Sequence, residues 1–138
     1  MATKTDTLSP DLYRVIDANL NRLKEGIRVI EDIARYLQND KPLASRLKAL
    51  RHQSRIDDQH SLLASRDSVN DVLRPTVDSE MNRDTLESII VANYKRAQES
   101  SRVLEEMYKI IDPSLSETFK QIRYELYTIE KTHLLSSE

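Results

Sequence analysis

The chain has 138 residues, 21 Lys and Arg against 23 Asp and Glu, and no Cys, which fits one ordinary domain. The near-neutral charge gives no reason to expect nucleic acid or an anionic membrane as a partner, and the absence of Cys excludes disulfides and Cys-based zinc sites. The sequence also lacks an apolar run of membrane-spanning length and a signal-peptide core, so we expect a cytoplasmic protein. A single Gly excludes a Gly-rich phosphate loop.

The first predicted helix covers about residues 10–38. Ser9 supplies a hydroxyl N-cap, and Pro10 takes the first helical position, where its missing N–H costs nothing. Residues 1–9 are expected to form a flexible N-terminus. Apolar residues recur in steps of three and four along one helix face, namely Ile16, Leu20, Leu23, Ile27, Ile30, Ala34 and Leu37.

The sequence QNDKP breaks this helix, and a second helix is predicted to start near Pro42. Its apolar side slips in phase around residues 52–60 and consists of Leu43, Leu47, Leu50, Ile56, Leu62 and Leu63. Residues 65–82 have no long periodicity and contain a Pro in their middle. We therefore predict that this stretch is mostly an ordered loop.

The third predicted helix begins near Asn82 or Asp84. Its apolar residues are Leu86, Ile90, Ala97, Leu104, Tyr108 and Ile111. Asp112 and Pro113 repeat the cap-plus-Pro signal and start a fourth helix that runs to about Leu135. The histidines are scattered and lack metal-ligand spacing, so surface or interfacial positions are expected for His52, His60 and His133.

The two halves of the chain carry the same pattern. Between residues 16–32 and 90–106, eight of seventeen positions are identical, whereas unrelated helices of this composition would share roughly one or two. With two residues removed after this stretch, the match continues, for example from Arg51 to Arg123. Each half reads as a helical hairpin that cannot bury its apolar face alone.

We therefore predict an all-α fold, a four-helix bundle built from two duplicated helical hairpins with pseudo-twofold symmetry. The bundle forms a single domain of residues 10–136. Its first repeat covers about residues 10–66, and its second repeat covers about residues 83–136.

The repeated positions are mostly polar and fall at every third residue, as Asn19, Arg22, Glu25, Arg28 and Glu31 and then as Asn93, Arg96, Glu99, Arg102 and Glu105. One interpretation is a solvated face with ion pairs three residues apart, such as Arg22–Glu25, Glu25–Arg28 and Arg28–Glu31. The apolar residues between them differ freely, however, which indicates a polar network or a ligand between the first and third helices. Such a set suits a phosphorylated small molecule.

The loop sequence ASRDSVNDV holds a second candidate site. Arg66 would bind phosphate, and Asp67 and Asp71 would be the catalytic residues that hold Mg²⁺. The alternative is a turn capped by Asp67 or Ser68 and an ion pair between Arg66 and Asp71. The sequence alone favours this structural alternative. Because the loop occurs only in the first half, it favours a site more than the repeated residues do.

In order, the stretches RVIDANLNRLKEGIRVIED, LKALRH, LLASRDSVNDV, ANYKRAQESSRVLEE and IRYELYTIEK resemble the helical domain in front of the thiamine-phosphate synthase barrel of cyanobacteria and other bacteria. The resemblance covers about residues 12–131, without the synthase barrel. It implies thiamine biosynthesis, with the domain acting as an alternative hydroxymethylpyrimidine phosphate kinase that makes the diphosphate. ATP and Mg²⁺ would then be the cofactors.

The resemblance also implies which residues hold phosphate and Mg²⁺, namely Asn19, Arg22, Glu25, Arg28, Asn93, Arg96, Glu99, Arg102, Arg66, Asp67 and Asp71. The alternative function is a non-catalytic helical module that forms a homo-oligomer or docks on a thiamine-phosphate synthase. In one respect the loop departs from the family pattern: residues 73–76 are LRPT, where the family continues with Gly and Thr. If that Gly lets the backbone approach a phosphate, its loss argues against activity at this end.

Overall fold

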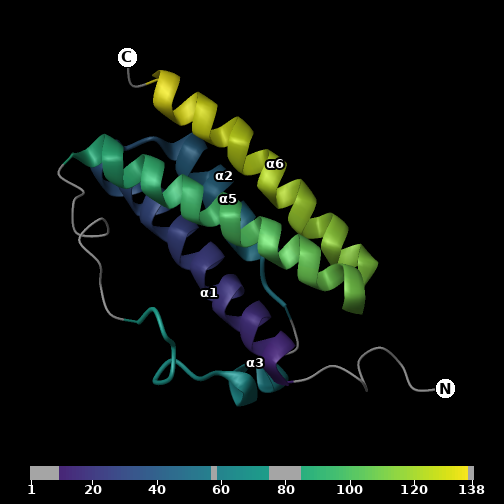
Figure 1. Cartoon of the computed structure of the whole chain (residues 1–138). Coiled ribbons are helices and arrows are strands. Elements are labelled where there is room, and N and C mark those ends of the chain that lie inside the picture. The colour runs from purple at the N-terminus through teal and green to yellow at the C-terminus, as the bar shows by residue number, and fades with distance from the viewer. Residues whose placement is uncertain (1–9, 57–58, 75–84, 137–138) are drawn as a thin grey trace.

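The computed structural model describes residues 10–56, 59–74 and 85–136. These residues form helices and connecting loops without any strand, which confirms the predicted all-α class. Figure 1 shows the elements α1 (Pro10–Asp32), the π-helix η2 (Ile33–Leu37), α2 (Lys41–Gln53), α3 (Gln59–Ser65), α5 (Leu86–Ile111) and α6 (Pro113–Ser136). The predicted cap Ser9 and the predicted start at Asn82 or Asp84 lie outside the described residues.

The long helices form a bundle in which α1 and α5 are central. In Figure 1, α1 packs against α5 with opposite direction, and α6 runs back along α5. On the other side, α2 and α3 pack on α1, with α3 beside the beginning of α1. The outer helices α2 and α6 meet only over a narrow contact, which includes an ion pair of 2.6 Å between Arg46 Nη2 and Glu125 Oε1.

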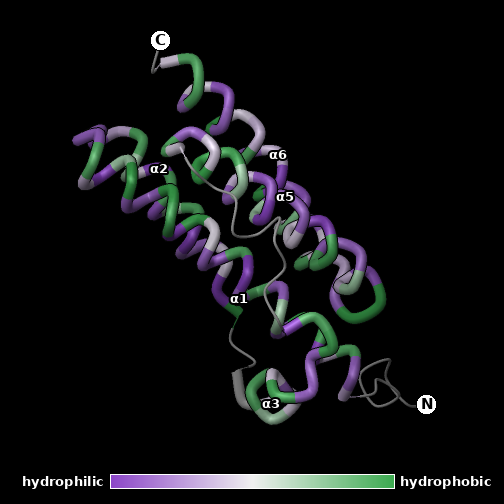
Figure 2. The backbone as a smooth tube through the Cα atoms, turned by 60° about the vertical axis from the view of Figure 1, so that its left-hand side comes forward, coloured by the Kyte–Doolittle hydropathy of each residue, from purple (hydrophilic) through white to green (hydrophobic). Residues whose placement is uncertain are grey.

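The apolar face predicted for the first helix is the centre of the core. Leu23 and Ile27 are fully buried in α1, and Figure 2 shows hydrophobic and hydrophilic positions alternating around the helices, as amphipathic packing requires. The two central helices approach closely at Gly26, where an added Cβ would lie 3.2 Å from the Asn93 carbonyl oxygen and 3.6 Å from the Ala97 Cβ. Small residues at this crossing therefore set the spacing between α1 and α5.

Three residues predicted to be apolar contacts are instead exposed. Leu37 is 65% exposed because the helix changes to π geometry, in which the Gln38 N–H bonds the Ile33 carbonyl at 3.0 Å. The wider turn rotates the following side chains away from the original face. Leu63 is 61% exposed because it belongs to a separate helix with its own phase, and Leu86 is 43% exposed as the first residue of α5.

The predicted boundaries of the first two helices need correction. The first helix is α-helical only to Asp32 and continues as η2, and the predicted second helix is divided into α2 and α3 at the phase slip. In the described residues, α5 begins at Leu86 and is capped by Thr85: the Thr85 hydroxyl accepts the Ser88 N–H at 3.0 Å, and Ser88 Oγ accepts the Thr85 N–H at 3.2 Å. The start of α6 at Pro113 and the non-helical stretch of residues 66–74 agree with the prediction.

Over the residues that the structure describes, none of the helices combines the length and the apolar character that a bilayer crossing requires.

Candidate functional site

A groove of about 610 Å³ lies between the first half of α1 and the loop that follows α3. It brings together residues that are far apart in the chain and that include five of the predicted site residues, Asn19, Arg22, Arg66, Asp67 and Asp71. The remaining polar lining comes mainly from Asp11, Arg14, Asp17, Asn21 and Ser68. This groove is the candidate site of the molecule.

Arg66 fixes the loop to α1 through Asp17. The Arg66 Nε and Nη2 atoms donate to the two Asp17 carboxylate oxygens at 2.8 and 2.9 Å, and only 8% of the Asp17 side chain is exposed. The hydrogen bond with Asp17 raises the pKa of the Arg66 guanidinium. The predicted pair of Arg66 with Asp71 is therefore wrong, because the loop turns Arg66 back onto the helix. The two-point contact leaves the Nη1 donors of Arg66 for another acceptor.

The loop is held in shape by its own aspartates. Asp67 Oδ1 accepts the Asn70 N–H at 3.0 Å, and Asp67 Oδ2 accepts the Asn70 side-chain amide at 2.8 Å. These hydrogen bonds stabilise the charged form of the Asp67 carboxyl and lower its pKa. Arg14 Nη2 donates to the Asp67 carbonyl at 3.0 Å, and Asp71 Oδ1 accepts the Leu73 N–H at 2.9 Å. The predicted turn capped by Asp67 is confirmed.

Arg22 is the uncommitted cation of the groove. Its side chain is exposed and makes no hydrogen bond or ion pair with any residue that the structure describes. By contrast, Arg66 and Arg14 both bind acceptors within the site. An anion that enters the groove thus meets a free guanidinium at Arg22 and the spare donors of Arg66, an arrangement suited to a phosphate group.

Two carboxylates of the groove, Asp67 and Asp71, are the residues that could hold a cation. Within the described residues, no group of three or more His, Asp or Glu side chains is placed to hold a metal ion. Mg²⁺ commonly binds one or two carboxylates together with substrate phosphates and water. The donor set therefore fits a Mg²⁺ ion that arrives with a phosphorylated ligand.

The other predicted site residues lie outside this groove. Arg28 pairs with Asp32 at 3.2 Å, and Arg102 pairs with Glu105 at 3.4 Å and with Glu106 at 3.3 Å. Glu25, Arg96 and Glu99 are exposed and form no hydrogen bond or ion pair with any described residue. As phosphate ligands, Glu25, Arg28, Asn93, Arg96, Glu99 and Arg102 stay predictions.

The three ion pairs expected between residues three apart in the first helix are not formed. Arg22 and Glu25 form no hydrogen bond or ion pair with any described residue, and Arg28 pairs with Asp32 instead. Nor do the repeated polar residues join α1 to α5 through any hydrogen bond or ion pair in the described part of the chain. The predicted network between these two helices is thus replaced by contacts within each half.

The repeated asparagines bond their own helices in the same way. Asn19 Nδ2 donates to the Val15 carbonyl at 2.9 Å, and Asn93 Nδ2 donates to the Ile89 carbonyl at 2.8 Å. Both side chains are 5% exposed. In each half, this hydrogen bond satisfies the side-chain amide of an asparagine that is buried beside the apolar face of its helix. Only Asn19 also lines the groove.

The repeated glutamates join each central helix to an outer one. Between α1 and α2, the Glu31 carboxylate accepts hydrogen bonds from Arg51 Nε at 2.7 Å and from Arg51 Nη2 at 3.2 Å. Between α5 and α6, the Glu105 carboxylate binds the Arg123 guanidinium, with Nε and Nη2 both at 3.1 Å. The carboxylates are nearly buried, so these pairs explain structurally why Glu and Arg occur at equivalent places in both halves.

Sequence reasoning missed Asp17, which anchors the loop. The sequence did contain a sign of this role, because Asp17 is an acidic residue that directly follows Ile16 of the apolar helix face. A carboxylate in that position needs a partner. The equivalent residue of the second half is Val91, so the anchor belongs to the first half alone.

Comparison with known proteins links the chain to a family model and to thiamine-phosphate synthases. A model of the ThiD2 family matches residues 14–132. Over 120 residues the chain is 38% identical to a thiamine-phosphate synthase of Nostoc punctiforme, covering 86% of this chain and 34% of that protein. A thiamine-phosphate synthase of Synechocystis is 39% identical over 120 residues, with 86% and 35% covered. The synthase of Rhodopirellula baltica is 37% identical over 128 residues, with 89% and 34% covered.

The chain thus spans about a third of the length of these relatives. No solved structure shows a significant match to it.

Proposed function

The chain belongs to the ThiD2 family, and we propose that it acts in thiamine biosynthesis by phosphorylating hydroxymethylpyrimidine phosphate to the diphosphate, with ATP as phosphate donor and Mg²⁺ as cofactor. The single observation that carries this proposal is the groove beside α1. It gathers the free guanidinium of Arg22, the spare donors of Arg66 and two loop carboxylates around one space. The pathway in the proposal agrees with the relatives that the chain matches, which are named thiamine-phosphate synthases.

In this proposal the substrate phosphate binds Arg22 and the Nη1 side of Arg66. Asp17 holds the Arg66 guanidinium in place through two hydrogen bonds, so that Arg66 meets the phosphate already oriented. Neutralising the phosphate charge lets one of its oxygens approach the γ-phosphorus of ATP. The new P–O bond forms as the bond from that phosphorus to the bridging oxygen of ADP breaks.

Asp67 and Asp71 are the proposed Mg²⁺ ligands. The hydrogen bonds from Asn70 stabilise the charged form of Asp67 and lower its pKa, and a carboxylate oxygen that accepts one hydrogen bond still has a lone pair for a cation. When bound, Mg²⁺ would neutralise charge that develops on the phosphoryl oxygens. The loop turn keeps both carboxylates on the groove side of the molecule.

The test is diphosphate formation by the purified protein with hydroxymethylpyrimidine phosphate, ATP and Mg²⁺. Arg22→Ala should lower kcat/KM about a hundredfold, because one charge-stabilising donor is removed. Arg96→Ala is the matched control, since Arg96 has the equivalent sequence position but lies outside the groove. A wild-type protein that forms no diphosphate above a blank would contradict the kinase proposal.

A second measurement separates binding from chemistry. Hydroxymethylpyrimidine phosphate should raise the melting temperature of the wild type and of Arg96→Ala, and this rise should be lost in Arg22→Ala. Equal loss in both variants would move the ligand to a position between α1 and α5. A full rise in both would remove Arg22 from the site.

The alternative is a non-catalytic helical module that docks on a thiamine-phosphate synthase or forms a homo-oligomer. The observation that favours it is that much of the repeated polar set is used within the fold, as in the pairs Glu31–Arg51 and Glu105–Arg123. Sedimentation of the chain alone and with a separate synthase tests this function. A saturable complex or a stable dimer, together with absent kinase activity, would support it.

The equivalent contacts also support a proposal about the origin of the fold, a four-helix bundle made from two duplicated hairpins with pseudo-twofold symmetry. The asparagine bonds and the Glu–Arg pairs occur at matching places in both halves. If the halves are equivalent, matched substitutions in them should have matched effects on stability.

A further inference from the structure

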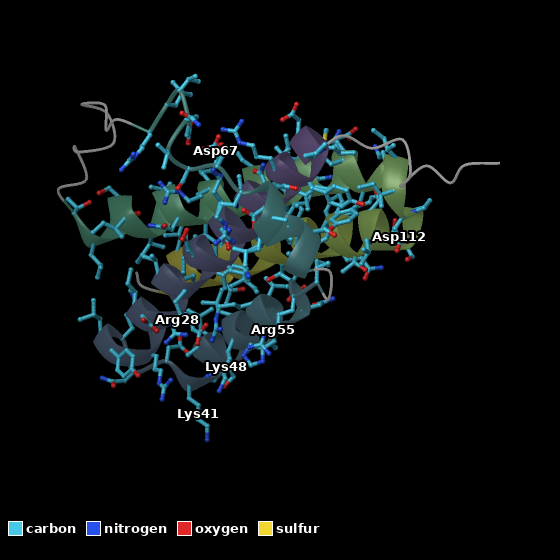
Figure 3. All side chains as sticks on the ribbon, turned by 90° about the horizontal axis from the view of Figure 1, so that it is seen from below. Arg28, Lys41, Lys48, Arg55, Asp67 and Asp112 are labelled. Carbon is cyan, nitrogen blue, oxygen red and sulfur yellow. The ribbon has the colours of Figure 1, made fainter. Side chains whose placement is uncertain are left out.

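Positive charge is concentrated on α2 although the chain as a whole has a net charge of −2. Residues 41–56 contain five Lys and Arg residues and neither Asp nor Glu. Seen from below in Figure 3, Lys41, Lys48 and Arg55 lie with Arg28 on one side of the molecule, while Asp67 of the first groove lies on the opposite side. The basic side of α2 is therefore separate from the candidate site described above.

A second groove, of about 320 Å³, opens on this basic side where η2 meets α2. Its cationic lining comes from Arg35 of η2 and from Lys41 and Lys48 of α2. Lys41 and Lys48 are seven residues apart and share a helix face. The other polar lining residues are Glu31, Asn39 and Ser45.

The three cations of this groove form no ion pair with an acidic residue in the described part of the chain. Lys41 and Lys48 form no hydrogen bond or ion pair with the described residues, and the Arg35 guanidinium lies 4.9 Å from the centroid of the neighbouring Tyr36 ring. The acid in the lining, Glu31, is already bound by Arg51 at 2.7 Å. The groove thus presents three exposed positive charges whose field the protein itself does not neutralise.

The second half keeps only part of this basic cluster. Lys120 occupies the place equivalent to Lys48, but Pro113 occupies the place equivalent to Lys41, and Glu117 occupies the place equivalent to Ser45. Lys109 of α5 is bound to Glu106 at 2.9 Å, and this contact lowers the pKa of Glu106. The corresponding region of α5 and α6 is therefore closer to neutral and still forms a helical pair.

We propose that the groove lined by Arg35, Lys41 and Lys48 binds the diphosphate group of a small molecule. Three cations that line one groove match the charge of a diphosphate, and lysines bind phosphate as compact point charges. Asn19 of the first groove and Arg35 of this second groove are sixteen positions apart along the helix, which corresponds to roughly 24 Å at the helical rise. This groove is a binding site distinct from the one proposed for phosphoryl transfer, and its assignment does not depend on that reaction.

Titration calorimetry with inorganic pyrophosphate, in the absence of Mg²⁺, tests the proposal. The protein is the Arg22→Ala variant, so that the first groove contributes little. Its dissociation constant should rise about tenfold for each of Lys41→Gln and Lys48→Gln, because each removes one charged contact. Lys120→Gln, at the position equivalent to Lys48, should leave the constant unchanged. These are exposed side chains, so the variants should fold normally.

Amide NMR spectra locate the ligand. Pyrophosphate should shift the resonances of residues 35–48 in the Arg22→Ala protein and should not do so in the double variant Lys41→Gln/Lys48→Gln. The same titration with ADP separates two sources of the diphosphate group: shifts with both ligands indicate a site open to esters, and shifts with pyrophosphate alone indicate one for the free ion. No saturable pyrophosphate binding, or unchanged binding in the double variant, would overturn the proposal whatever the outcome of the kinase assay.

Discussion

The first half of the molecule, α1 with α2 and the loop, differs from the second half, α5 with α6, in the polar residues that they do not share. Each half contains a buried asparagine that donates a hydrogen bond to a carbonyl of its own helix, and a Glu–Arg ion pair that joins two helices. Only the first half adds Asp17, with its partner Arg66, and an acid-free basic segment on α2. The shared asparagines and Glu–Arg pairs therefore hold the fold together, whereas the salt bridge that shapes the first groove and the acid-free segment beside the second occur in the first half alone.

The largest expected effect concerns the shared ion pairs. Glu31→Gln and Glu105→Gln should each lower the free energy of unfolding by about 3 kcal/mol, because each leaves an arginine poorly paired at a site of low exposure. Urea denaturation of both variants measures this loss. Similar values would sharpen the equivalence of the two halves. If one variant loses less than a third of what the other loses, the equivalence is broken.

A double-mutant cycle provides the control for this first prediction. Arg51→Met combined with Glu31→Gln should cost less than the sum of the two single changes, since the second substitution removes the group that the first had left unpaired. Simple additivity would show that the 2.7 Å contact between Glu31 and Arg51 contributes little to stability.

Sequence alone could predict the parts of the molecule that follow the helical period. The buried face of α1, including Leu23 and Ile27, follows from spacings of three and four residues. The change to η2 could not be predicted, because one wider turn alters the phase without requiring a particular residue type. Leu37 was consequently placed on the wrong side.

The candidate site was predictable only in its residue types. The loop sequence pointed to Arg66, Asp67 and Asp71, and the structure places all three at one groove with Arg22. The partner of Arg66 could not be found, because Asp17 is 49 residues away in the chain and the path of the intervening loop decides the contact. Likewise, Glu31 and Arg51 were recognised as repeated positions but not as a pair.

A smaller effect is expected from a buried polar group of the second half that the first half lacks. His133 is 2% exposed; its Nδ1 lies 2.8 Å from the Tyr94 hydroxyl, and its Nε2 lies 2.7 Å from Gln38 Oε1. A neutral imidazole satisfies both contacts by accepting from Tyr94 and donating to Gln38. Burial lowers the pKa of His133, although the nearby Asp40 acts in the opposite direction.

The sign of the pH dependence follows from this lowered pKa. In the unfolded chain, the histidine takes up a proton as the pH falls through about 6.5, while the buried imidazole stays neutral until a lower pH. The unfolded state then binds more protons, so stability should fall as the pH drops below about 6.5. Urea denaturation at pH 7.5 and 5.5 should show this loss in the wild type and a smaller one in His133→Gln. An equal loss in both would assign the effect to other groups.

The smallest effect is expected where the two outer helices meet. Arg46 and Glu125 are 2.6 Å apart, but their side chains are 41% and 46% exposed, and exposed pairs contribute at most about 1 kcal/mol. Arg46→Ala should therefore change the free energy of unfolding by less than about 0.5 kcal/mol, as measured by urea denaturation in 0.15 M salt. Each outer helix would then be held by its own central partner, α2 by α1 and α6 by α5. A loss as large as that of Glu31→Gln would instead make the contact between α2 and α6 a principal support of the bundle.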